Sequence, residues 1–215
     1  FVLNNMLREY FWHILITLGL FVVILFGATA LSLRFSNDIT FTDDLQVSEP
    51  SITIVDPQLG SEEAKVTIVT YSDYSCGSCA TVEEILLDAV VAHPSEVRIV
   101  WKDMPNETRH HEAVRSAIAA RCAGKQGKFW EYNAALFADQ AALGETLYQN
   151  IASEVGVDTP SFATCLEKED TKPLVERTLA EGLALEITAT PTIFVNGERF
   201  TGSLSRTEIE KVIAG

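Results

Sequence analysis

The hydrophobic positions of the chain follow three patterns in succession. Residues 11–33 are apolar and contain no Asp, Glu, Lys or Arg, and they follow a short flank, residues 1–10. Residues 34–50 are polar, unpatterned and end in proline, as in a flexible tether. From residue 51 to residue 215, apolar residues recur with strand-like and helix-like spacing. We therefore predict one folded domain over 51–215, preceded by a hydrophobic segment and a tether.

The hydrophobic segment 11–33 has the length of a membrane-spanning helix. About 20 apolar residues, at a rise of about 1.5 Å each, cross the ~30 Å core of a bilayer. Aromatic residues 10–12 lie at one end, where an aromatic belt would lie. The small residues Ala28–Ala30 match a signal-peptide cleavage pattern, but the apolar run exceeds the usual ~7–15 residues. We favour an uncleaved transmembrane anchor, with a cleaved signal sequence as the alternative.

The first half of the domain predicts a strand, a helix and a strand. Residues 52–55 and 64–71 are rich in β-branched residues, and 96–102 form another such run. Between them, residues 79–91 place apolar side chains at helical spacing. A strand–helix–strand order is the crossover unit of a parallel sheet, so the fold class is α/β.

The second half predicts a block of helices followed by a β-hairpin. Residues 108–186 are mostly helical in pattern, and residues 192–200 read as a hairpin around Asn196-Gly197. Residues 205–213 form an amphipathic helix that begins with a capping box of Ser205 and Glu208. We predict helices inserted between two parts of one sheet.

Composition and charge narrow the functional classes. Hydrophobic residues make up 47% of the 215 residues, which is enough for a packed core. The formal net charge of -14 argues against nucleic acid as a partner, because phosphate binding needs a positive surface. Phosphate-binding glycine loops and Ser-His-Asp arrangements are missing from the sequence as well. All four cysteines follow the hydrophobic segment, as expected for a domain exposed to an oxidising compartment.

Cys76 and Cys79 are separated by only two residues, which leaves three interpretations. A zinc site needs four ligands, and Cys122 and Cys165 each lack a neighbouring ligand, so we predict no metal. A structural disulfide between Cys76 and Cys79 would close too small a loop to stabilise the fold much. The pair lies where a strand ends and a helix begins, and unpaired N–H groups there favour a thiolate at Cys76. We favour the redox interpretation.

Several motifs together resemble a known family. YSDYSCGSC at 71–79 follows a strand, a helical block comes next, and TPTIFVNG at 190–197 follows that block. Residues 97–105 and 122–130 fit the same pattern. Over 51–215 the chain resembles the DsbA-like thiol–disulfide oxidoreductases of the thioredoxin superfamily, in particular their membrane-tethered bacterial branch. The resemblance implies a thioredoxin fold with an inserted helical subdomain at about 108–186.

The resemblance also implies a role for each site residue. Cys76 would be the exposed nucleophile and Cys79 the buried resolving thiol. Pro191 would be a cis-proline facing the pair, and Thr190 would contact an extended substrate. Without the resemblance, Thr190-Pro191 would read as an ordinary trans peptide bond before a strand.

The dipeptide Gly77-Ser78 tunes the redox pair and departs from the best-known members, which carry a histidine there. Without that donor, helix dipole and backbone N–H groups supply about 0.3–2 kcal/mol. This lowers the pKa of a thiol by at most about 1.5 units, so we expect a moderately acidic Cys76 and a mild oxidant.

The resemblance further implies a structural disulfide between Cys122 and Cys165, with two separate buried thiols as the alternative. It requires no cofactor. The expected partners are exported protein substrates, the membrane through the N-terminal helix, and a quinone-linked membrane redox protein. The expected location is a bacterial cytoplasmic membrane with the domain outside, or a periplasmic or secreted domain if the segment is cleaved. Reverse use as a reductase or isomerase, and peptide binding without catalysis, are the competing functions.

Other polar and aromatic residues near the pair receive structural interpretations. Asp73 is expected to be a loop or capping residue. Glu83 and Glu84 are expected on a solvated helix face. Trp101, Phe129, Trp130 and Phe137 are expected in core packing.

Overall fold

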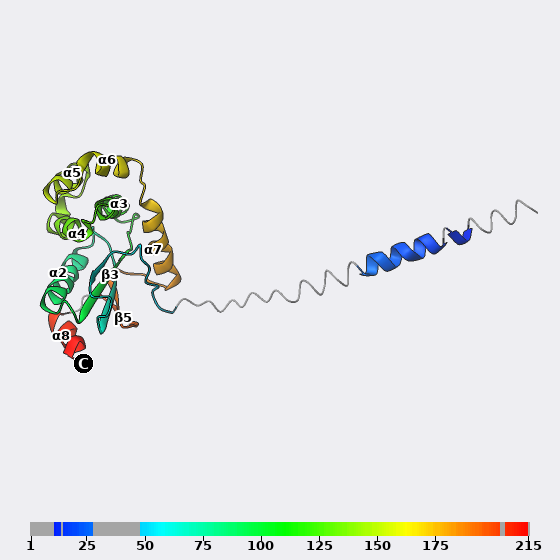
Figure 1. Ribbon diagram of the computed structural model, residues 1–215, viewed down its shortest axis with the longest axis horizontal. Coiled ribbons are helices and arrows are strands. Elements are labelled where there is room, and N and C mark those ends of the chain that lie inside the picture. Colours follow the sequence, from blue (N-terminus) through cyan, green and yellow to red (C-terminus); the bar gives the residue numbers. More distant parts are fainter. Residues whose placement is uncertain (1–10, 14, 28–47, 203–204, 215) are drawn as a thin grey trace, which may run out of the picture. The chain divides into compact units, whose positions relative to one another are not determined.

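The structure is a computed structural model, and it divides the chain into two units, Phe1–Leu45 and Gln46–Gly215. It describes residues 11–13, 15–27, 48–202 and 205–214. In the first unit, residues 11–13 and 15–27 are helical, and the second unit contains the sheet (Figure 1).

The expected membrane-spanning helix over residues 11–33 is not confirmed. No helix within the described ranges combines the length and the hydropathy that a bilayer crossing requires. Residues 28–33, which include the cleavage pattern at Ala28–Ala30, lie outside the described residues, and so does most of the tether predicted at 34–50.

The second unit is organised by a mixed five-stranded sheet of order β1-β3-β2-β4-β5. The strands are β1 (Gln58–Gly60), β2 (Val66–Ser72), β3 (Val97–Asp103), β4 (Thr192–Val195) and β5 (Glu198–Thr201). Strands β2 and β3 run parallel, in register from Val66 opposite Val97, and the other neighbours are antiparallel. The expected crossover unit and hairpin are both confirmed, and the hairpin turn places Asn196 and Gly197 at φ 48° and 87°.

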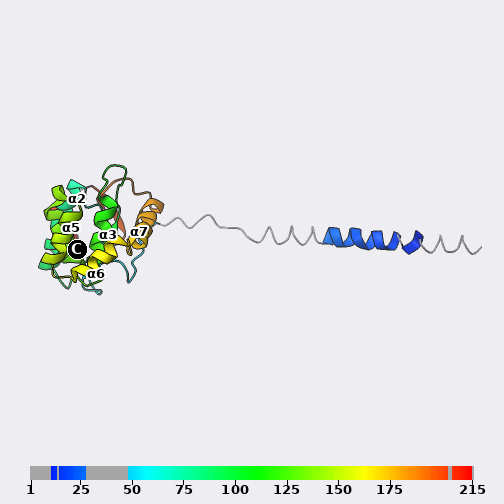
Figure 2. The same cartoon turned by 90° about the horizontal axis from the view of Figure 1, so that it is seen from above.

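Alternation along the strands divides the core of the sheet into two faces. One face packs on α2 (Gly77–Ala92) and α8 (Arg206–Ala214), and the other packs on α7 (Lys172–Ala184). The α2 side takes Val66, Ile68, Val97, Ile99, Ile193 and Val195, whereas the α7 side takes Val69, Tyr71, Val100 and Phe194. Both views show α2 and α7 on opposite sides of the unit (Figures 1 and 2). Because side chains alternate between the two faces along a strand, this alternation determines which strand residues pack against which helix.

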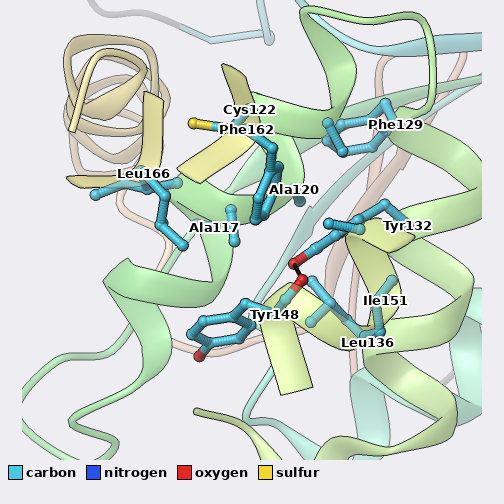
Figure 3. Close-up of a cluster of buried hydrophobic side chains, with 14 of the residues drawn as sticks. Ala117, Ala120, Cys122, Phe129, Tyr132, Leu136, Tyr148, Ile151, Phe162 and Leu166 are labelled. Carbon is cyan, nitrogen blue, oxygen red and sulfur yellow. Dashed lines mark hydrogen bonds between the residues drawn. The ribbon is translucent and has the colours of Figure 1, made fainter. Parts of the chain in front are cut away.

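The helical block between β3 and β4 has its own hydrophobic core. It contains α3 (Ala113–Gly124), α4 (Phe129–Ala138), the short 3-10 helix η1 (Gln140–Ala142), α5 (Glu145–Glu154) and α6 (Thr159–Glu167), and α7 returns the chain to the sheet. Figure 3 shows the core side chains converging from α3, α4, α5 and α6, with the Tyr132 hydroxyl donating to the Tyr148 carbonyl at 2.9 Å. Trp101, Phe129, Trp130 and Phe137 pack in or against this core, as predicted.

A buried ion network attaches the start of the domain to the sheet. The Lys102 ammonium of β3 lies 3.0 Å from Asp56 and 2.8 Å from Glu181 of α7, and Lys102 and Asp56 are almost fully buried. Arg177 adds a second cation, 2.6 Å from Asp56. Burial is the largest influence and acts to raise the pKa of Asp56, but the hydrogen bonds from Lys102 and Thr53 and the charge of Lys102 together outweigh it and keep that pKa below its ordinary value.

The strand predicted at residues 52–55 is wrong. Thr53 donates its backbone N–H and its hydroxyl to the Asp56 carboxylate, both at 2.8 Å, and the chain turns there. Ile54 is 98% exposed, so its side chain joins no core. The edge strand β1 begins three residues later, at Gln58. A local side-chain hydrogen bond here overrides β-propensity.

Cys122 of α3 and Cys165 of α6 form a disulfide, with a separation of 43 residues. Both cysteines are buried and belong to the apolar cluster of the helical block, in which Figure 3 labels Cys122. Because a cross-link of this length restricts the unfolded chain, the chain-entropy relation assigns it about 4 kcal/mol of stabilisation.

Removing this disulfide tests that assignment. We expect the Cys122→Ala/Cys165→Ala variant to lose about 3–4 kcal/mol in the free energy of unfolding, measured by urea denaturation monitored by circular dichroism. The Cys76→Ser variant, which leaves the cross-link in place, serves as the control and should lose less than about 1 kcal/mol. A loss of less than about 1 kcal/mol in the double variant would contradict a stabilising role.

Candidate active site

Cys76 occupies the N-cap position of helix α2, after the short loop that follows strand β2. Its backbone is extended, with φ -95° and ψ 114°, and its carbonyl accepts the N–H groups of Cys79 at 3.0 Å and Ala80 at 3.4 Å. The sulfur therefore lies at a helix N-terminus, where free N–H groups and the helix dipole favour negative charge. Cys76 is half-buried, whereas Cys79 is only 1% exposed.

The two thiols have opposite acidity. A hydrogen bond from Cys79 is the largest influence on Cys76 and, with burial opposing it, lowers the pKa of Cys76 from 9.0 to about 5. The Ser78 hydroxyl, with 3.2 Å between its oxygen and the Cys76 sulfur, adds a second donor. Burial, followed by the hydrogen bond to Cys76, raises the pKa of Cys79. At pH 7 the pair therefore holds one thiolate, at Cys76, and one thiol, at Cys79.

The expected pKa shift of at most about 1.5 units at Cys76 is too small. That expectation counted the helix dipole and the backbone N–H groups but no side-chain donors. Cys79 and Ser78 supply those donors, and a hydrogen bond to a charged group contributes about 1.5–3 kcal/mol. The pair thus holds a better stabilised thiolate than expected, and the mild oxidant expected from the missing histidine stays a prediction about its reduction potential.

Thr190 and Pro191 lie beside the pair, although they follow it by more than a hundred residues. The Thr190–Pro191 peptide bond is cis, and it leads into strand β4. The Cys76 sulfur lies 3.5 Å from the Thr190 carbonyl oxygen. That carbonyl oxygen can accept a hydrogen bond from the thiol form only. A side-chain hydrogen bond from Thr190 nevertheless adds to those from Cys79 and Ser78 in lowering the pKa of Cys76. The Cys122–Cys165 disulfide belongs to the helical block and not to this site.

Two residues hold the loop that carries Cys76. The buried Asp73 carboxylate accepts the backbone N–H of Ser75 at 2.8 Å and that of Asn106 at 2.9 Å, so its predicted loop role is confirmed. Gln140, in η1 of the helical block, donates its side-chain amide to the carbonyls of Cys76, at 3.0 Å, and Tyr74. Gln140 was missed from the sequence, because nothing in its surroundings links it to a loop 64 residues earlier.

Glu83 contradicts the expectation of a solvated face. Its side chain lies on α2, one turn after Cys79, and it is 2% exposed. Burial is the cause that raises the pKa of its carboxyl from 4.5 to about 8. Glu84 is exposed, as expected. Helix α4 covers the side of α2 that the helical pattern alone assigned to solvent.

The ionisation of Cys76 can be measured directly. We expect thiolate absorbance near 240 nm, and the rate of alkylation of Cys76, to titrate with a midpoint at about pH 5. Since this pKa is depressed from 9.0, the thiolate's stabilisation of the reduced protein is complete above about pH 9 and is lost as the pH falls through about 5. A midpoint near pH 8–9 would contradict the assignment.

The Ser78→Ala variant isolates one donor to the Cys76 thiolate. We expect it to raise the Cys76 midpoint by about one unit, because one hydrogen bond to a charged sulfur is lost. Thr81→Ala removes a hydroxyl from the exposed face one turn further along α2 and should leave the midpoint unchanged. Equal midpoints in both variants would mean that Ser78 does not stabilise the thiolate.

Comparison with known proteins agrees with this geometry. Residues 53–214 match the sequence profile of a family described as Thioredoxin. A thioredoxin-like oxidoreductase from Silicibacter pomeroyi DSS-3 is 26% identical, with a TM-score of 0.68 over 75% of this chain and 92% of that one. Oxidised BdbD from Bacillus subtilis is 25% identical, with a TM-score of 0.67 over 78% of this chain and 97% of that one.

Curated relatives are longer proteins. The chain is 32% identical over 163 residues to the Na(+)/H(+) antiporter NhaA of Herminiimonas arsenicoxydans, a match that covers 74% of this chain and 26% of the antiporter. It is 33% identical over 172 residues to Na(+)/H(+) antiporter NhaA 1 of Mycolicibacterium gilvum (strain PYR-GCK), which covers 75% and 28%. The chain thus spans about a quarter of the length of these relatives. The profile match over most of the chain, together with the sheet and the paired cysteines, shows that the chain belongs to the thioredoxin family and carries a DsbA-like thiol–disulfide oxidoreductase domain.

Proposed function

We propose that the domain introduces disulfide bonds into exported proteins, with Cys76 as the nucleophile and Cys79 as the resolving thiol. The observation that carries the proposal is the half-buried Cys76 at the N-cap of α2, with its sulfur 3.2 Å from the Ser78 hydroxyl oxygen, beside a buried Cys79. This arrangement lowers the pKa of Cys76 to about 5. A stabilised thiolate favours the reduced form of the pair, so the oxidised form readily accepts two electrons from a substrate dithiol.

The reaction then proceeds through a mixed disulfide. A substrate thiolate attacks the Cys76 sulfur of the oxidised pair, a substrate–Cys76 bond forms, and the Cys76–Cys79 bond breaks. Cys79 leaves with the electron pair and takes up a proton. A second substrate thiolate attacks the first substrate sulfur and releases Cys76 as its stable thiolate. The substrate loses two electrons, and the redox pair gains them.

The surface beside Thr190 supports an extended, partly apolar substrate. A groove of about 490 Å³ is lined there by the loop after β3, by α7 and by the residues before Pro191. Its apolar lining includes Met104, Leu179, Leu183 and Ile187. Reduced, unfolded chains expose such side chains near their cysteines, so the groove suits them as substrates.

We place the domain outside a bacterial cytoplasmic membrane. The charge-free run 11–33 supports a single-pass anchor, and a thiol–disulfide site with a separate disulfide suits an oxidising compartment. A quinone-linked membrane partner would reoxidise the pair after each turnover. If the segment is cleaved, the domain is periplasmic or secreted.

The similarity to antiporters favours a second candidate role. The matched stretches in two relatives named Na(+)/H(+) antiporter cover about three-quarters of this chain. In this role the same cysteine pair would exchange disulfides with a membrane transport protein. A reductase or isomerase would use the pair in reverse, and a non-enzymatic peptide-binding module would not need Cys76.

Two cysteine variants separate these functions. We expect Cys76→Ser to abolish oxidation of a reduced, unfolded two-cysteine peptide, followed by mass spectrometry. We expect Cys79→Ala to accumulate mixed disulfides with disulfide-containing proteins. Its Cys76 thiolate attacks a substrate disulfide and displaces one substrate thiolate, and no Cys79 thiol remains to displace the substrate sulfur bound to Cys76. Identifying the trapped proteins in cells would distinguish exported proteins from a transport protein.

The Cys122→Ala/Cys165→Ala variant provides the control, because it keeps the redox pair and should still oxidise the peptide. Oxidation that persists in Cys76→Ser would sink the enzymatic proposal and favour a peptide-binding module.

A further inference from the structure

A second groove lies between α2 and α4, next to the redox pair. It encloses about 350 Å³, within the range of pockets that take small ligands or single long side chains. Its lining comes from two helices only: Ala80, Thr81, Glu83, Glu84 and Leu87 of α2, and Ala134, Phe137 and Ala138 of α4. Figure 1 shows these helices as neighbours at the junction of the sheet and the helical block.

Glu83 is the unusual member of this lining. It is 2% exposed, and neither of its carboxylate oxygens has a hydrogen-bond partner. Buried polar atoms in native proteins are nearly always paired, because an unpaired one carries an uncompensated desolvation cost. A carboxyl that lines a groove without a partner therefore points to a donor supplied by a bound molecule.

A second unpaired acceptor lies on the facing helix. Asn133 of α4 donates its amide nitrogen to the Tyr74 hydroxyl at 3.1 Å, while its amide oxygen is buried and unpaired. Glu83 is close enough to Tyr74 for its negative charge to raise the pKa of that phenol, after burial and Asp103. Asn133 is not among the residues that line the groove, so the unpaired Glu83 carboxyl is the acceptor that favours a donor-rich group, such as a guanidinium or an ammonium.

The rest of the lining suits a cation on an apolar stem. Leu87 and Phe137 provide apolar walls, and a guanidinium packs well against an aromatic face. Glu84 adds a negative charge at the exposed rim, and the whole chain carries a net charge of -14. The lining residues of α4 carry no charge. Long basic side chains, arginine above all, meet these conditions.

The position of the groove identifies the molecule that would supply this side chain. Ala80, the residue after Cys79, forms one end, and Leu87 lies about 10 Å further along the helix at a rise of about 1.5 Å per residue. A protein whose cysteine reaches Cys76 would extend over this surface. We propose that the groove binds a basic side chain of the protein that exchanges disulfides with Cys76, two to five residues from the reacting cysteine.

The binding of a basic side chain depends on pH through Glu83. The inference rests on the disulfide exchange proposed above. Burial raises the pKa of Glu83 to about 8, so the carboxyl is mostly neutral at pH 6 and gives up its proton to pair with a cation. The facing groups are Tyr74, from the loop before α2, and Asn133 of α4; Glu84 lies on the same helix. The preference for a basic side chain is therefore stronger at pH 8 than at pH 6.

Matched peptides test the proposal. The full chain, with its Cys76–Cys79 pair oxidised, would react with single-cysteine peptides that carry arginine two to five residues from the cysteine. Each peptide has a control in which citrulline, which has the same shape without the charge, replaces the arginine. At pH 8 and 0.15 M salt, which screens distant charges, we expect the best arginine peptide to form the mixed disulfide about tenfold faster. At pH 6 we expect a ratio near one, because Glu83 is then protonated.

Two isosteric variants serve as the test and its control. Glu83→Gln should bring the ratio to about one at both pH values, whereas Glu84→Gln, which removes the same charge from the rim, should keep most of the preference and its pH dependence. A ratio near one in the unaltered chain at pH 8, or an unchanged ratio in Glu83→Gln, would overturn the proposal. If both peptides react at equal rates, the exchange function stands and only the recognition fails; if neither reacts, both proposals fail.

Discussion

The hydrogen bond from Cys79 to the Cys76 sulfur, at the first turn of α2, sets the chemistry of this domain. It joins one thiol that is half-buried and one that is almost fully buried, and it moves their acidities in opposite directions. The surrounding fold serves to keep these two sulfurs at one end of a helix. Strand β2 delivers Cys76 to that helix, and Asp73 and Gln140 fix the loop between them.

The helical block contributes to the site as well as to stability. Gln140 reaches from the block to the carbonyl of Cys76, and Asn106, which binds Asp73, lies where the chain leaves β3 for the block. Helix α4 of the block also packs beside Glu83, a buried residue of the helix α2 that carries the cysteines. Because the block has its own core and a disulfide, it provides a rigid support from which these contacts act on the loop.

Much of the fold could be predicted from periodicity, and the misses have physical causes. Apolar residues recur every second residue in strands β2 and β3 and about every 3.6 residues in helix α2. These patterns are visible in the sequence because each element buries one face. Residues 52–55 have the composition of a strand, but the Asp56 carboxylate turns the chain and the network around Lys102 holds it there. No local pattern carries that information, since Lys102 lies 46 residues away.

The active site likewise combines residues that the sequence predicts with properties that it does not. The C-x-x-C and Thr-Pro motifs point to Cys76, Cys79, Thr190 and Pro191, and the structure brings these residues together. The acidity of Cys76 depends on side-chain donors whose geometry appears only after folding. Glu83 was misjudged because a charged residue on a helix usually faces water, and the helix that covers it comes 46 residues later.

The equilibrium reduction potential of the Cys76–Cys79 pair, titrated against glutathione on the full chain, tests the central claim most directly. A stabilised Cys76 thiolate favours the reduced pair, so the account predicts a potential between roughly -120 and -200 mV, in the range of proteins that donate disulfides. A value near about -270 mV, where thioredoxin lies, would contradict it and identify the domain as a reductant.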